Sequence, residues 1–234
     1  MTGTYETARA RLRGLVLNQP TPYRAGDLAV DHAGLRDNIE RWLAHRVPVI
    51  MLTAGTSDFA SLSEEEIRAL TRTTVEAVAG RAFVIACTGP WWLGRTIQFA
   101  RFCADLGADA LMVVKTEPPA MSPEDAERFH RAIADAASIP LVYHSYLVGP
   151  KSIETLRRAL EVPAVIAMKQ ETNDFMQYAL LRDSFGDRLG VMAWAGGELA
   201  YYAHQCCAVG SLTGTGQWAP GPERRFVEQM LTGD

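Results

Sequence analysis

The stretch Val165-Ile-Ala-Met-Lys169 is a run of four apolar residues that ends on a lysine. A short apolar run between segments of helical pattern is typical of a strand that is buried on both faces, as in a parallel sheet. Seven more such runs alternate with helical segments along the chain, which predicts an α/β fold. They are Leu15–Leu17, Val49–Thr53, Phe83–Cys87, Ala110–Val114, Leu141–His144, Val191–Trp194 and a weaker run at Gly210–Thr213.

Local signals place helix ends between these runs. Ser63 with Glu66 predicts a capping box, and Ser122-Pro-Glu-Asp125 gives a cap, a first-turn proline and an acidic first turn. Gly107 and Gly186 fall where helices should end. The 234 residues contain no linker-like stretch, so we expect a single-domain (β/α)8 TIM barrel over residues 1–234. An open doubly wound sheet is the alternative, but closure of eight units removes both sheet edges.

The composition argues against several partners. A net charge of −4, from 23 basic and 27 acidic residues, leaves no basic excess for nucleic acid. The longest apolar runs are strand-sized and no signal-like stretch follows the N-terminal arginines, so we expect a cytoplasmic protein without membrane contact. The four cysteines lack CxxC spacing, which predicts core thiols rather than a zinc site. We expect neither a metal nor a cofactor.

Lys169 is the first candidate for chemistry. Barrel enzymes place function at the C-terminal ends of the strands, where this lysine falls. A buried ammonium without a partner tends to lose its proton, and a neutral amine attacks ketones. Alternation puts Val165 and Ala167 on the face of Lys169, and the small Ala167 leaves room along the barrel axis. In the alternative interpretation, Lys169 extends to solvent or pairs with Glu171.

Tyr143 and His144 end the preceding run. Neighbouring strands lie about 4.8 Å apart, so an inward Tyr143 at the height of Lys169 can reach the same substrate atom and move protons. Alternation then turns His144 away, as a residue that packs or supports the site from outside. The alternative for Tyr143 is a wall tyrosine with an ordinary hydrogen bond.

The segment Thr53-Ala-Gly-Thr-Ser-Asp58 follows the second strand. Its glycine turn can aim backbone N–H groups and two hydroxyls at one point, which suits a carboxylate. Gly55, Thr56 and Ser57 are therefore the predicted carboxylate-binding residues, although Gly-Thr-Ser is also an ordinary turn.

Together these motifs resemble the dihydrodipicolinate synthase / N-acetylneuraminate lyase family of class I, Schiff-base aldolases, over nearly the whole chain. Thr21-Pro-Tyr23 is similar to the family's early TPF element, and Ala54–Ser63 is similar to GTTGEFPSLT without a gap. Tyr143 matches the tyrosine of the YN motif, Val165–Lys169 matches the Schiff-base lysine strand, and Ala208–Leu212 looks like the GxxGxIS turn.

The resemblance implies a lyase, either an aldolase or a dehydratase, that acts on pyruvate or a related 2-oxo acid. It implies that Lys169 forms the imine, that Tyr143 moves protons, and that the loop at Gly55, Thr56 and Ser57 holds the substrate carboxylate. It also implies a homo-oligomer, either a dimer or a tetramer. The possible residues of the substrate pocket are Glu117, His144, Gly196 and Leu212.

Several positions depart from the family pattern. Gly55 replaces the first threonine of GTTGE, and Ser57 and Asp58 replace its glycine and glutamate, so the usual proton relay is altered. Glu117 stands near the tyrosine that the family lends to a neighbouring subunit. No arginine follows Tyr143 where the synthase binds its aldehyde substrate. We infer a diverged member that is not an authentic dihydrodipicolinate synthase and lacks the family's C-terminal helical region.

Three other interpretations fit the sequence. Lys115 also ends a strand, but its neighbours look like a solvated loop in which the amine stays protonated. Gly210–Gly216 lies where barrels often bind phosphate, which would suit a phosphate-handling enzyme. A catalytically degenerate homologue would bind a 2-oxo acid without turnover.

Five side chains near predicted strand ends each have two interpretations. The tryptophans line a substrate pocket, or they pack between the barrel and its helices or at a subunit interface. The carboxylates replace the missing acid-base groups, or they lie in solvent. These residues are Trp91, Trp92, Trp218, Asp58 and Glu117.

Overall fold

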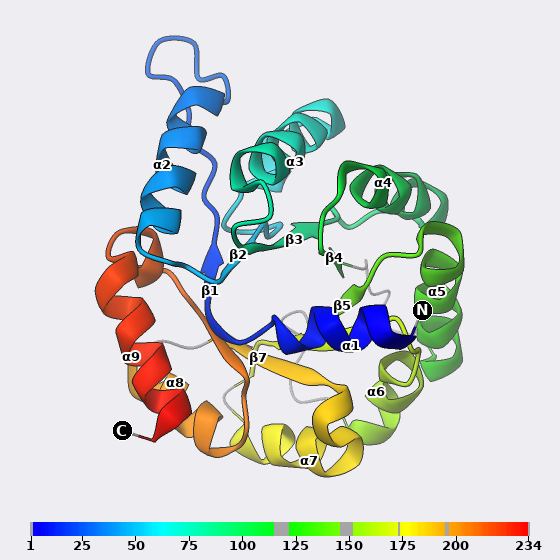
Figure 1. The fold of residues 1–234 in the computed structure, drawn as a ribbon. Coiled ribbons are helices and arrows are strands. Elements are labelled where there is room, and N and C mark those ends of the chain that lie inside the picture. Colours follow the sequence, from blue (N-terminus) through cyan, green and yellow to red (C-terminus); the bar gives the residue numbers. More distant parts are fainter. Residues whose placement is uncertain (1, 115–121, 146–151, 173, 195–196, 234) are drawn as a thin grey trace.

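The computed structural model describes residues 2–114, 122–145, 152–172, 174–194 and 197–233. Eight parallel strands form a closed barrel in which each strand pairs with the next, and β8 pairs with β1 (Figure 1). The predicted α/β TIM barrel is therefore confirmed, with every expected strand present. The strands are β1 (Gly14–Asn18), β2 (Val49–Met51), β3 (Phe83–Cys87), β4 (Ala110–Val113), β5 (Leu141–Ser145), β6 (Val165–Gln170), β7 (Gly190–Trp194) and β8 (Gly210–Thr213).

Helices surround the barrel (Figure 1). Within the described ranges, no helix combines the length and the apolarity that a membrane crossing requires. The helices are α1 (Thr2–Ala10), α2 (His32–Ala44), α3 (Glu64–Val78), α4 (Leu93–Leu106), α5 (Pro123–Ala137), α6 (Ile153–Leu160), α7 (Phe175–Phe185), α8 (Gly197–Gln205) and α9 (Pro220–Thr232).

The helix ends follow from the predicted local signals. Ser63 and Glu66 form the capping box of α3, in which each side chain accepts a hydrogen bond from the other residue's backbone N–H. Ser122 caps α5. Gly107 ends α4 at a φ of 88°, a left-handed conformation that glycine adopts without strain. Gly186 ends α7, also at a positive φ.

The strands are buried on both faces. Every residue of β3 and β6 is buried, for example, because inner side chains fill the barrel while outer ones meet the helices. Trp194, the last residue of β7, departs from this pattern with 57% exposure. The strand residues that are not fully buried thus lie at the C-terminal ends of strands.

Helix α1 lies across one opening of the barrel and was not expected from the sequence (Figure 1). It packs against β6. Leu12, which connects α1 to β1, is completely buried. Since α1 comes immediately before β1, it covers the N-terminal end of the barrel and leaves the C-terminal end for the predicted site.

Candidate active site

Lys169 lies one residue before the end of β6, and only 4% of its surface is exposed. Its strand partners are His144 on β5 and Met192 on β7. Its charge also acts on the thiol of Cys87, which lies on the non-adjacent strand β3. An effect of this kind between strands that are not neighbours acts across the inside of the barrel. The side chain of Lys169 therefore points into the C-terminal end of the barrel.

Three side chains form a polar cluster here: Lys169, His144 and Glu171, which directly follows β6. Nζ of Lys169 lies 3.1 Å from Nε2 of His144 and forms an ion pair with Oε1 of Glu171. Nε2 of His144 lies 3.1 Å from the same Oε1. The side chains of Lys169 and Glu171 are only 6% and 11% exposed. Glu171 is thus the partner that the alternative interpretation named, but the pair is enclosed rather than solvated.

Burial and charge set the protonation of this cluster. Burial would raise the pKa of the Glu171 carboxyl, but the hydrogen bond with His144 and the charge of Lys169 outweigh it and lower the pKa to about 2. Burial lowers the pKa of the His144 imidazole, and the charge of Lys169 acts in the same direction against Glu171. The cluster therefore holds a carboxylate and a neutral imidazole at neutral pH, and the imidazole, not the strongly acidic carboxyl group, is the base available to the lysine.

Tyr143 lies outside this cluster, which corrects the prediction. The register of β5 and β6 pairs Tyr143 with Met168, and His144 with Lys169. Paired residues share a face and successive residues alternate, so His144 points inward and Tyr143 points toward the helices. The Tyr143 ring stacks on His130 of α5 with 5.2 Å between the ring centroids. The predicted orientations of Tyr143 and His144 are therefore wrong, whereas the position of His144 beside Lys169 agrees with its other interpretation as a possible residue of the substrate pocket.

In the loop after β2, several groups that were predicted to bind a carboxylate form hydrogen bonds within the protein instead. Oγ of Ser57 donates to the Gln19 carbonyl at 2.6 Å and accepts from the Thr53 N–H at 3.1 Å, with no surface exposed. The N–H groups of Ser57 and Thr56 donate to the carbonyl and the hydroxyl of Thr53, respectively. Ser57 therefore fixes the loop instead of facing a ligand. Gly55 and Thr56 are exposed, which leaves the Thr56 hydroxyl accessible.

The remaining predicted pocket residues fall into two groups. Leu212 is buried on β8, where it pairs with Trp194 of β7. The exposed indole of Trp194 stands at the C-terminal end of the barrel above it. Glu117 and Gly196 lie outside the described residues, as does Lys115.

Two of the side chains with open interpretations have structural partners. Asp58 accepts a hydrogen bond from the Tyr23 hydroxyl at 2.8 Å. Trp91 meets a phenylalanine of α4 edge-on, with 5.2 Å between the ring centroids, which is the packing alternative. Trp92 and Trp218 are 71% and 77% exposed.

Glu171 is the site residue that sequence reasoning undervalued, since it was considered only as a neutralising partner. Its spacing from Lys169 was the available signal, because residues i and i+2 of an extended segment share a face. The intervening Gln170 points the other way, where its side chain accepts a hydrogen bond from Ser145 at 2.5 Å and contacts Gln177.

Comparison with known proteins gives this site a family context. The model of the Dihydrodipicolinate synthetase family matches residues 11–234. The probable 5-dehydro-4-deoxyglucarate dehydratase 2 of Streptomyces avermitilis is 33% identical over 168 residues, which are 70% of this chain and 50% of that protein. The 4-hydroxy-tetrahydrodipicolinate synthase of Thermomicrobium roseum is 34% identical over 185 residues, which are 78% of this chain and 61% of that protein. The chain thus spans less than two thirds of the length of either relative.

Solved structures share the fold. Dihydrodipicolinate synthase from Oceanobacillus iheyensis has a TM-score of 0.88 at 22% identity, covering 98% of this chain and 76% of its own. N-acetylneuraminate lyase from Fusobacterium nucleatum has a TM-score of 0.87 at 18% identity, covering 96% and 77%. The chloride-inhibited dihydrodipicolinate synthase from Acinetobacter baumannii, complexed with pyruvate, has a TM-score of 0.85 at 24% identity, covering 95% and 77%. These likenesses show the fold, and the sequence match supplies the assignment. This chain belongs to the dihydrodipicolinate synthetase family.

Proposed function

We propose that this protein is a class I aldolase-type lyase in which Lys169 forms a Schiff base with pyruvate or a related 2-oxo acid. One observation carries the proposal: a lysine amine, 4% exposed, lies at the C-terminal end of a barrel strand, paired with Glu171 and 3.1 Å from an imidazole that can take its proton. Family membership supports the same chemistry. The relatives include a dehydratase, and a structural neighbour is complexed with pyruvate.

The proposed reaction begins when Lys169 gives a proton to the neutral imidazole of His144, while Glu171 stays ionised. The neutral amine then attacks the ketone carbon, and the resulting carbinolamine loses its hydroxyl as water when the proton is returned. The iminium that forms withdraws electrons, so that loss of a proton from the adjacent carbon yields an enamine. The enamine adds to an aldehyde in an aldol reaction, or expels a hydroxyl group in a dehydration.

The substrate carboxylate is proposed to lie at Gly55 and Thr56, because their surface is exposed while Ser57 is fully used within the loop. The altered loop and the lack of an arginine after Tyr143 argue against an authentic dihydrodipicolinate synthase. We therefore propose pyruvate or a sugar-derived 2-oxo acid as the substrate, in either a carbon-carbon or a carbon-oxygen bond reaction.

Reductive trapping tests the proposal. Protein treated with pyruvate and borohydride is expected to gain the mass of the reduced adduct on the peptide that contains Lys169. Lys169→Ala should abolish the adduct, whereas Lys115→Ala should retain it and serves as the matched control. Unmodified wild-type protein, or an adduct that persists in Lys169→Ala, would contradict the assignment.

A 2-oxo-acid-binding homologue without turnover is the second candidate, because Lys169 is ion-paired with Glu171 in the unliganded protein. Exchange of the pyruvate methyl protons with solvent separates the two candidates, since exchange requires the enamine. We expect exchange that depends on Lys169. Trapping without exchange would favour the binding protein.

The assembly and the compartment stay predictions from the sequence. We propose a homo-oligomer in the cytoplasm. Sedimentation of the purified protein tests the first point, and a monomer at micromolar concentration would contradict it.

A further inference from the structure

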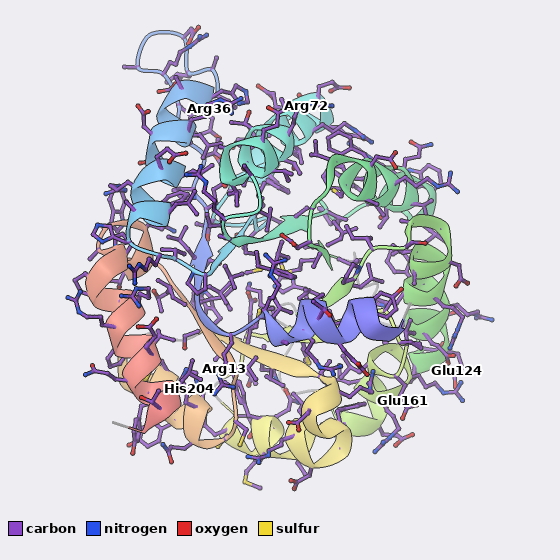
Figure 2. All side chains as sticks on the ribbon, viewed as in Figure 1. Arg13, Arg36, Arg72, Glu124, Glu161 and His204 are labelled. Carbon is purple, nitrogen blue, oxygen red and sulfur yellow. The ribbon has the colours of Figure 1, made fainter. Side chains whose placement is uncertain are left out.

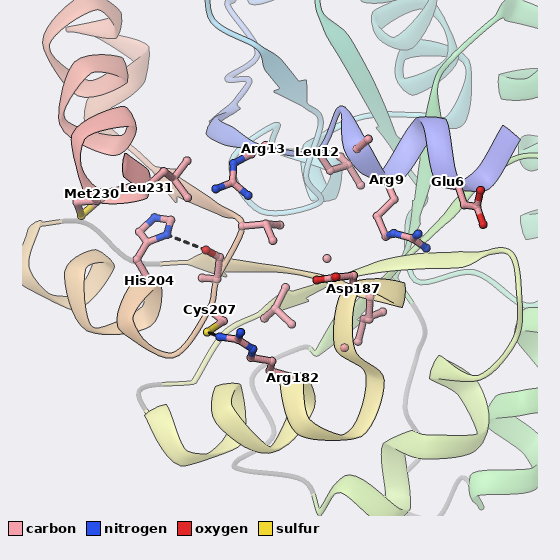
Figure 3. Close-up of a pocket in the computed structure, with 17 residues that line it drawn as sticks. Glu6, Arg9, Leu12, Arg13, Arg182, Asp187, His204, Cys207, Met230 and Leu231 are labelled. Carbon is pink, nitrogen blue, oxygen red and sulfur yellow. Dashed lines mark hydrogen bonds between the residues drawn. The ribbon is translucent and has the colours of Figure 1, made fainter. Parts of the chain in front are cut away.

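A second cavity lies near the N-terminal ends of β7 and β8, away from the C-terminal end that holds Lys169. Its volume is about 530 Å³. Side chains from α1, α7, α8 and α9 surround it, and the first residues of β7 form part of its wall (Figure 3). The size suits a small organic ligand. None of the chemistry proposed for Lys169 uses this cavity.

Two arginines line the same half of this cavity. Arg13, just before β1, and Arg182 on α7 extend into it from opposite walls (Figure 3). Among the described residues, no carboxylate oxygen lies within 4.0 Å of a guanidinium nitrogen of either arginine. Arg11, two residues before Arg13, pairs with Asp109 at 2.7 Å. Arg13 and Arg182 therefore lack a carboxylate partner among the described residues, whereas Asp109 neutralises the charge of Arg11.

The acidic residues of the cavity lie at its other end. Glu6 and Asp187 line it beside Arg9 (Figure 3). Arg9 donates a hydrogen bond to the carbonyl of Arg188 at 2.9 Å. This end is therefore mixed in charge, whereas the end with Arg13 and Arg182 is lined by cations and neutral groups.

His204 completes the cationic end. It is 9% exposed, and its Nδ1 lies 2.7 Å from the Ala208 carbonyl, which fixes the ring. Burial lowers the pKa of this imidazole, and the charge of Arg13 adds to the effect. Because the ring is neutral, it adds no further positive charge to this end, and a bound anion would offset the charge of the arginines. Arg182 also contacts the Cys207 thiol.

Apolar side chains line parts of both ends of the cavity. They come from the segment before β1, from β7 and its approach, and from the last turns of α9. A ligand that fills the cavity must therefore combine an anionic group with an apolar part. The apolar residues are Leu12, Leu189, Val191, Met230 and Leu231.

We propose that this cavity binds a small organic phosphate, with the phosphate group at the end lined by Arg13 and Arg182 and the apolar part against Met230 and Leu231. A guanidinium group can donate a pair of hydrogen bonds to two oxygens of a phosphate. Two arginines without a carboxylate partner in the described part of the chain also match the charge of a phosphate ester, about −2, better than the single charge of a carboxylate. The charge of this end therefore favours a phosphate ester.

Calorimetric titration with phenyl phosphate tests the proposal. We expect saturable binding of one molecule per chain, and much weaker binding of phenol, which lacks the anion. Arg13→Gln and Arg182→Gln should each weaken binding by about tenfold or more, since hydrogen bonds to charged groups contribute about 1.5–3 kcal/mol. Arg72→Gln is the charge-matched control, because Arg72 lies on α3, on another side of the molecule (Figure 2), and should bind normally.

Two further measurements locate the bound probe. Lys169→Ala should bind phenyl phosphate as the wild type does, which separates this site from the barrel mouth and from the proposed lyase reaction. Bound phenyl phosphate should also slow alkylation of Cys207, which lines the cavity. The proposal is overturned by a lack of saturable binding, by equal loss in Arg72→Gln, or by binding that depends on Lys169 instead of Arg13 and Arg182.

Discussion

His144 and Glu171 determine where the proton of Lys169 can go. Their atoms lie within reach of the amine, and their lowered pKa values keep both unprotonated at neutral pH. Tyr143 stacks on His130 on the outer side of β5 instead. A Schiff-base lysine needs a nearby group that both takes and returns a proton. In the proposed reaction of Lys169, His144 occupies that position and Glu171 is the ion-pair partner.

Substitution of His144 is expected to slow imine formation more than substitution of Tyr143. His144→Gln should lower the rate of borohydride-trapped adduct formation by about a hundredfold, a typical contribution of a general acid-base group. Tyr143→Phe keeps the ring stacked on His130 and should have a smaller effect. Single-turnover trapping with pyruvate gives both rates. An equal or larger loss in Tyr143→Phe would mean that the phenol, not the imidazole, serves Lys169.

Glu171 should make the protein's stability depend on pH in the acidic range. Its carboxyl has a pKa of about 2 in the folded protein, below the ordinary value of 4.5. The ionised form is therefore favoured by folding, so its contribution is complete above pH 4.5 and is lost as the pH falls from 4.5 toward 2. Glu171→Gln should be less stable than wild type at pH 7, with a difference that shrinks below pH 4.5. Urea unfolding at several pH values measures this difference, and one that stays constant would exclude the linkage.

At the scale of elements, alternating apolar runs were enough to predict all eight strands, because each strand is buried along almost its whole length. Because both faces of each strand are buried, the sequence does not show which residues face the barrel axis. In β5, Tyr143 and His144 are both buried, so hydrophobicity cannot assign their faces. The register with β6 settles it, and that register contains an irregularity at Leu141 and Val142. Pairing across strands is a tertiary property that one strand's sequence does not contain.

Helix α1 was missed for a different reason. Its sequence, TGTYETARA, has only two alanines and a tyrosine as apolar residues. Its place against β6 comes from tertiary packing. The loop after β2 was recognised as a polar turn. Its sequence did not reveal that the Ser57 hydroxyl is hydrogen-bonded to the backbone of Gln19 and Thr53. Partners distant in sequence decide the role of such a hydroxyl.

Within that loop, Thr56 and Ser57 should separate ligand binding from stability. Ser57→Ala leaves the Gln19 carbonyl and the Thr53 N–H without a buried partner and should lower the free energy of unfolding by about 1–3 kcal/mol. Thr56→Ala should change stability little but raise the pyruvate concentration needed for half-maximal trapping. Urea unfolding and trapping titrations are the two measurements. The loop assignment fails if Ser57→Ala is as stable as wild type, or if Thr56→Ala binds pyruvate normally.

The whole barrel separates chemistry from stability along its axis. The polar cluster of Lys169 lies where the strands end, while α1 and Leu12 cover the end where they begin. Barrel enzymes commonly divide these roles between the two ends, since loops at the C-terminal end vary without disturbing the core. The N-terminal cavity with Arg13 and Arg182 breaks this division, because it puts unneutralised charge at the stabilising end.

Leu12→Ala tests the division directly. Leu12 is completely buried between α1 and β1, so its truncation should lower the free energy of unfolding by about 2–5 kcal/mol. Leu28→Ala is the control, because Leu28 is 73% exposed and should change stability little. Under conditions in which both variants are folded, borohydride trapping at Lys169 should match the wild type, since neither leucine belongs to the polar cluster. A trapping rate that falls with Leu12→Ala, while the protein stays folded, would show that packing at the N-terminal end controls the geometry of the lysine.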